Sequence, residues 1–107
     1  MVDFDAFFKE IKDGAIEIAR EEAKGFVREA KSDGKDYLDS LKLDLELWTK
    51  LLAEGKLSIE DFEFLVRGKK DLAKMKALTE AGFAAVRIDR IRNALVELVI
   101  TAAGKMV

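Results

Sequence analysis

Apolar side chains in the first half of the chain recur at a spacing of 11 residues. Two rows of positions show this recurrence: Phe4, Ala15, Phe26, Tyr37 and Trp48, and then Phe8, Ala19, Ala30, Leu41 and Leu52. Charged residues recur at the same spacing between the rows. An 11-residue repeat corresponds to about 3.67 residues per turn, which keeps one face of a nearly straight helix in register. The pattern therefore predicts a long amphipathic helix from Phe4 to about Leu52.

Gly34 decides whether this helix is continuous. It follows Ser32 and Asp33, and such a cluster is typical of a turn. The apolar positions nevertheless continue through it at steps of three or four residues, as they do in one helix. Because Gly costs only about 1 kcal/mol relative to Ala inside a helix, we favour a continuous helix. The alternative is a turn at Gly34, which would give an antiparallel four-helix bundle.

Small and capping residues mark the boundaries of the later helices. Gly55 is expected to follow the C-cap of the first element, and Ser58 to cap the start of the next helix. We expect a kink or a short break at Gly68, and a last helix from about Phe83 to Ala103. The chain, residues 1–107, is thus predicted to be one all-α domain, a helical bundle built on the long helix.

Two glycines inside the predicted long helix are also 11 residues apart. They are Gly14 and Gly25, and each comes directly before a member of the first apolar row. Glycine inside a helix is destabilising, so another reason for its presence is needed. We interpret both positions as places where a neighbouring helix comes close.

Pro, Cys and His are all absent from the sequence. The absence of Pro fits uninterrupted helices. Without Cys and His, the chain lacks the commonest metal ligands and the partners of Cys-His and Ser-His catalytic pairs. Paired carboxylates such as Glu21 and Glu22 fall on positions that are predicted to face solvent. We therefore expect no enzymatic activity, no catalytic or metal-binding residue and no cofactor.

Charge is distributed unevenly along the chain. Residues 1–66 carry 10 basic and 17 acidic side chains, a formal charge of −7, whereas residues 67–107 carry 9 and 4, a charge of +5. Two halves that pack together would neutralise each other. The densest group of basic residues forms a candidate basic patch: Arg67, Lys69, Lys70, Lys74 and Lys76. Since Asn93 is the only amide side chain available to read bases, we expect no nucleic-acid binding.

The function that these patterns favour is self-association or the binding of another protein. The candidate interface is part of the apolar stripe: Phe26, Tyr37, Leu41, Leu45, Trp48 and Leu52. Burial of this stripe against the same stripe of a second copy predicts a homodimer with twofold symmetry. One alternative is peripheral association with a membrane surface through the last helix. Another is an engineered helical scaffold, which fits the abundance of strong helix formers.

The expected location follows from two further features. The residues after Met1 lack the basic segment and the apolar core of a signal peptide. The most apolar run, from Ala94 to Ala103, contains Glu97 and has about half the length of a membrane span. We therefore expect a cytoplasmic protein.

Overall fold

Residues 3–106, the part of the chain that the computed structural model describes, form five α-helices and one short 3-10 helix. Their bounds are α1 (Phe4–Glu22), α2 (Val27–Ala53), α3 (Ile59–Gly68), η1 (Lys70–Leu72), α4 (Lys76–Glu80) and α5 (Ala85–Gly104). No strand occurs within these residues. The prediction of an all-helical fold is therefore confirmed.

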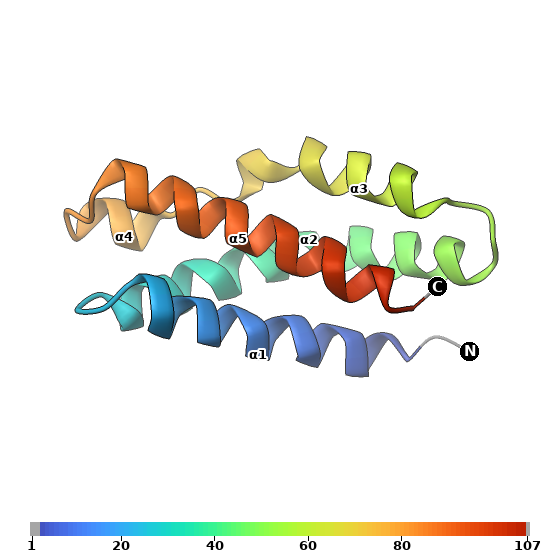
Figure 1. Cartoon of the computed structure of the whole chain (residues 1–107), viewed down its shortest axis with the longest axis horizontal. Coiled ribbons are helices and arrows are strands. Elements are labelled where there is room, and N and C mark those ends of the chain that lie inside the picture. Colours follow the sequence, from blue (N-terminus) through green and yellow to red (C-terminus); the bar gives the residue numbers. More distant parts are fainter. Residues whose placement is uncertain (1–2, 107) are drawn as a thin grey trace.

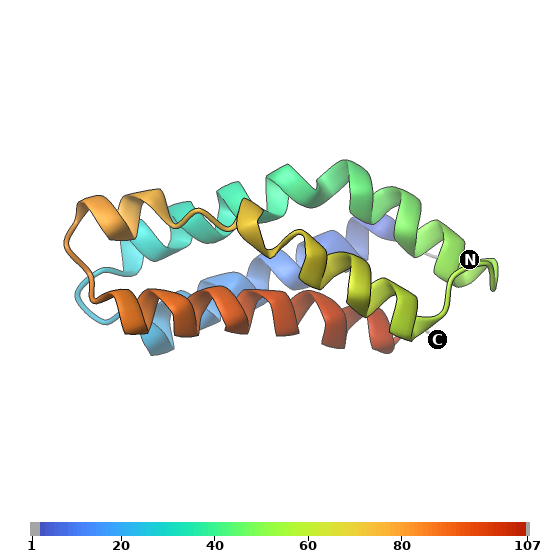
Figure 2. The same cartoon turned by 90° about the horizontal axis from the view of Figure 1, so that it is seen from above.

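The helices lie along one elongated body that measures 43 × 23 × 19 Å. α1 packs against both α2 and α5 (Figure 1). α3 and α4 lie on the opposite side, where α3 contacts α5 and α4 contacts α2 (Figure 2). The beginning of α1 and the end of α5 come together at one end of the body (Figure 1). The apolar faces of all five helices thus meet in one interior.

The first helix is interrupted, and its interruption lies at Gly25 rather than at Gly34. α1 ends at Glu22, and Gly25 adopts a φ of +86° in the left-handed region that favours glycine. α2 then passes through Gly34 without a break. The predicted long helix from residue 4 to 52 is therefore wrong, and so is a turn at Gly34, although continuity through Gly34 is confirmed. The apolar rows persist across the turn because both helices present their apolar faces to one core.

Helix ends were easier to predict than this turn. The carboxylate of Asp3 accepts a hydrogen bond from the backbone N–H of Ala6 at 3.1 Å. The hydroxyl of Ser58 accepts one from the backbone N–H of Asp61 at 3.0 Å. Gly55 has a φ of +72° directly after the C-cap of α2, as the sequence predicts. Local capping chemistry therefore fixes these three boundaries.

The two glycines that were expected at close helix contacts have different structural roles. A Cβ atom at Gly14 would lie 2.5 Å from Cδ1 of Leu98, so α5 does approach α1 closely there. A Cβ atom at Gly25 would meet no heavy atom within 4 Å. The expectation is confirmed for Gly14 and wrong for Gly25, which provides the turn instead. The expected break at Gly68 is confirmed, because α3 ends at that residue.

Candidate functional site

The candidate interface lies in the interior of the folded chain. Its members are buried or partly buried by helices of the same chain: Phe26, Tyr37, Leu41, Leu45, Trp48 and Leu52. The ring of Trp48 meets the ring of Phe62 from α3 edge-on at 6.3 Å. The ring of Phe26 lies 5.0 Å from that of Phe83. The sequence thus identified side chains that need burial, and helices of the same chain supply neighbours for them.

Members of the candidate basic patch pair with acidic residues on different helices. Arg67 donates hydrogen bonds to Glu97 of α5 at 2.6 Å and to Glu63 at 2.9 Å. The hydrogen bonds to Glu97 and Glu63 raise the pKa of the Arg67 guanidinium above its usual value. Lys69 points the other way and lies 3.8 Å from Asp44 of α2. These two residues therefore connect helices.

The remaining three members of the patch line two clefts. Lys70 and Lys74 line a cleft of about 350 Å³ beside α5, together with Arg92. Lys74 and Lys76 line another cleft of about 300 Å³ beside α2, which also contains Tyr37. Lys74 is common to both clefts. The structure therefore does not present the five basic residues as one surface.

Asp33 has a structural role that the sequence did not reveal. Its side chain is only 3% exposed, although it belongs to a cluster that is typical of turns. Its carboxylate accepts hydrogen bonds from the backbone N–H groups of Ala77 at 2.9 Å and Leu78 at 2.8 Å. Asp33 in α2 thus caps α4, which has no side-chain cap at its own N-cap residue, Met75. No local pattern could indicate a cap that lies more than 40 positions away from its helix in sequence.

Tyr37 combines burial with an unpaired polar group. The residue is 1% exposed, and its hydroxyl has no hydrogen-bond partner within residues 3–106. Burial raises the pKa of the Tyr37 hydroxyl to about 12. The side chain is therefore neutral across the physiological range.

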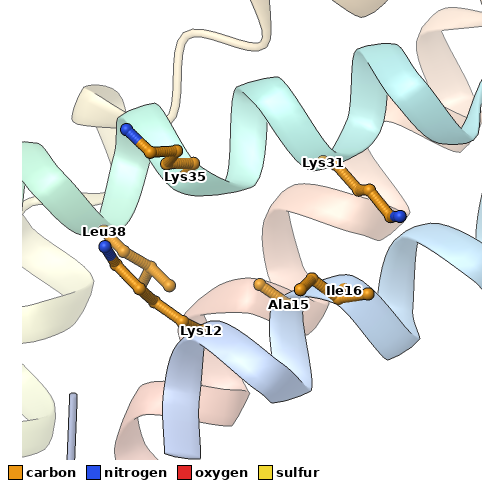
Figure 3. Close-up of a pocket in the computed structure, with 6 residues that line it drawn as sticks. All are labelled: Lys12, Ala15, Ile16, Lys31, Lys35 and Leu38. Carbon is orange, nitrogen blue, oxygen red and sulfur yellow. The ribbon is translucent and has the colours of Figure 1, made fainter. Parts of the chain in front are cut away.

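A third cavity, the lysine-rimmed cavity, lies between α1 and α2 and has a volume of about 190 Å³. Its lining residues are Lys12, Ala15, Ile16, Lys31, Lys35 and Leu38. Lys12 reaches from α1 toward α2, and Lys31 reaches from α2 toward α1, with Ala15 and Ile16 between them (Figure 3). No pattern in the sequence indicates this site, because Lys12 meets Lys31 and Lys35 only when the turn at Gly25 brings the two helices side by side.

One carboxylate lies beside the lysine-rimmed cavity. Asp39 is 3.0 Å from Nζ of Lys35 and 3.4 Å from Nζ of Lys12. The hydrogen bond from Lys35 lowers the pKa of the Asp39 carboxyl, and the same bond raises the pKa of Lys35. Both groups are therefore charged at neutral pH.

Several large apolar side chains remain on the surface. Leu43 and Leu47 of α2 are 81% and 53% exposed, and they lie one helical turn apart. Phe64 of α3 and Val86 of α5 are exposed on other helices. We call the surface around Leu43 and Leu47 the outer face of α2. It points away from the buried stripe of the same helix.

The last helix, which was the candidate for contact with a membrane surface, has its apolar face in the core. Ile91, Leu95 and Val99 are each at most 1% exposed. A lipid surface would have to compete with the protein interior for these side chains. None of the described helices is both long enough and apolar enough to cross a membrane.

The described part of the chain contains no group of three or more acidic side chains placed to hold a metal ion. No protein-family model, curated protein or solved structure matches this chain. A functional proposal therefore rests on the chemistry of the surfaces and cavities described above.

Proposed function

We propose that this protein acts by binding rather than by catalysis, and that it self-associates through the outer face of α2. The observation that carries this proposal is the exposure of Leu43 and Leu47, 81% and 53%, on the longest helix. Two large apolar side chains one turn apart form a continuous apolar strip. Removing them from water would contribute roughly 1.5–3 kcal/mol for each fully buried side chain.

The size of this face limits the strength of the association. A helix of 27 residues is about 40 Å long, because each residue adds about 1.5 Å. With a helix width of about 10 Å, the face offers about 400 Å² on each copy. Stable interfaces bury about 800 Å² on each partner. We therefore expect a reversible dimer that forms at high protein concentration.

Charges next to the two leucines give the association an unusual dependence on salt. Three acidic residues, Asp39, Asp44 and Glu46, lie within one helical turn of Leu43 or Leu47, together with two basic residues, Lys42 and Lys50. Acidic side chains outnumber basic ones by only three to two on this stretch, so two copies of the face carry the same net charge and repel each other weakly at low ionic strength. Because salt screens exposed charges beyond about 10 Å at 0.1 M, we expect association to increase with added salt.

Analytical ultracentrifugation over about 10 μM to 1 mM protein, at low and high NaCl concentrations, tests the proposal. We expect Leu43→Ser/Leu47→Ser to remain monomeric under all conditions. The matched control, Phe64→Ser/Val86→Ser, removes exposed apolar side chains elsewhere and should still associate. A wild-type protein that stays monomeric at the highest protein and salt concentrations would overturn the proposal, as would association that survives in Leu43→Ser/Leu47→Ser.

A further inference from the structure

The lysine-rimmed cavity combines an apolar floor with a cationic rim. Ala15 and Leu38 are buried and Ile16 is partly buried, so the floor offers hydrocarbon surface. Three lysines line the cavity, and in Figure 3 Lys12 and Lys31 reach across the gap between the helices while the ammonium group of Lys35 points away from it. The geometry points to a binding site for a small organic anion, in which a carboxylate or sulfonate is attached to an aromatic ring or a short acyl chain. This site does not involve Leu43 or Leu47, so it is independent of the proposed self-association.

The volume of the cavity limits the apolar part of the ligand. The cavity measures about 190 Å³. A dry apolar cavity of about 150 Å³ in another protein holds one benzene molecule, whereas drug-sized ligands occupy about 300 Å³ or more. One ring or a short acyl chain therefore fits. A peptide helix or a long acyl chain does not fit.

The charge around the cavity selects an anion. Asp39 pairs with Lys35 and Lys12, but Lys31 makes no ion pair within the described residues. Two ammonium groups thus share one carboxylate and the third has none, although residues 1–66 as a whole carry a formal charge of −7. A bound anion would supply the missing negative charge. Its attraction to the lysines is strengthened by the apolar walls, which lower the local dielectric constant.

The lysine stems favour the same class of ligand. Lysine side chains bury their methylene groups along apolar surfaces and keep the ammonium group in water. In Figure 3 the stems of Lys12 and Lys31 cross the gap between the helices, one on each side of Ala15 and Ile16. A ring on the floor would therefore contact hydrocarbon on its edges, while its carboxylate would meet ammonium groups at the opening.

An NMR titration with benzoate as the probe tests this inference, with backbone amide signals as the readout. Benzyl alcohol provides the ring without the charge, and acetate provides the charge without the ring. We expect benzoate to shift the signals of Ala15, Ile16 and Leu38 with a Kd of about 1 mM, as suits so small a ligand. The two control ligands should bind at least about tenfold more weakly, because each lacks one half of the interaction.

Two double variants separate a built site from general electrostatic attraction. Lys31→Gln/Lys35→Gln removes two charges from the rim, and we expect benzoate to bind about tenfold more weakly. Lys9→Gln/Lys50→Gln removes two charges from the same helices outside the lining, and affinity should be unchanged. Ile16→Trp fills the cavity and should abolish binding with all lysines present. Equal effects of the two double variants, equal binding of benzyl alcohol, or shifts that map elsewhere would each overturn the inference.

Discussion

The hydroxyl of Tyr37 is a buried polar group without a hydrogen-bond partner in the described chain. Leaving such a group unpaired in the core destabilises a protein by about 1–3 kcal/mol. We therefore expect Tyr37→Phe, which keeps the ring, to raise the free energy of unfolding by about 1 kcal/mol at pH 7 in urea denaturation. Tyr37→Leu, which also removes the ring, should lower it. A loss of stability in Tyr37→Phe would contradict this view of the hydroxyl.

Ionisation of the Tyr37 hydroxyl makes the free energy of unfolding decrease as the pH rises above 10. Burial raises the pKa of the hydroxyl from 10.0 to about 12, so between these pH values the folded state holds a proton that the unfolded state releases. The free energy of unfolding therefore falls by about 1.4 kcal/mol per pH unit across this window. The stability that depends on the neutral hydroxyl is fully present below pH 10 and is lost as the pH rises to about 12. Tyr37→Phe has no hydroxyl to ionise, so its free energy of unfolding should lack this decrease between pH 10 and about 12. Because Tyr37 is the only tyrosine, phenolate absorbance reports its ionisation directly.

At the scale of helices, replacing Gly34 and Gly25 by alanine in two separate variants tests where the chain turns. Gly34→Ala should stabilise α2 by about 1 kcal/mol, because its Cβ would lie 3.5 Å from Cβ of Ala15, an ordinary contact. Gly25→Ala should destabilise the protein by about 1–2 kcal/mol, because its φ of +86° is strained for alanine. Thermal and urea unfolding measure both effects. Destabilisation by Gly34→Ala together with stabilisation by Gly25→Ala would instead place the turn at Gly34 and the helix interior at Gly25.

These helices also show how far the sequence could determine the fold. A cap such as Ser58 was predictable because its hydrogen bond reaches only three residues along the chain. The turn at Gly25 was missed because apolar positions keep the same spacing on both sides of it. The lysine-rimmed cavity was missed because Lys12 and Lys31 meet only through helix pairing. Contacts between distant segments leave no periodic signal in one sequence.

At the scale of the whole molecule, exposed ion pairs join the acidic and basic halves of the chain. Glu10 lies 3.3 Å from Lys105, Glu22 lies 3.9 Å from Arg90, and Asp44 lies 3.8 Å from Lys69. The expected contact between oppositely charged halves is therefore found within one copy. Such surface pairs contribute about 0–1 kcal/mol each and are screened by salt.

Salt should thus act in opposite directions on folding and on association. We expect about 1 M NaCl to lower the free energy of unfolding of the monomeric Leu43→Ser/Leu47→Ser variant by at most about 1–2 kcal/mol. The same salt should increase dimer formation by the wild-type protein. Chemical denaturation by urea at low and high salt measures the first effect. A loss much larger than this would contradict the weak contribution assigned to the surface pairs.

The cap that Asp33 provides to α4 has a consequence for the order of folding. A helix of five residues is too short to persist alone in water, and this one receives its N-terminal hydrogen bonds from another helix. The stretch from Lys76 to Glu80 therefore becomes helical only after α2 has formed and docked. In a refolding experiment, protection of the amides of Ala77 and Leu78 from exchange with deuterated solvent therefore reports when α4 has docked on Asp33 of α2.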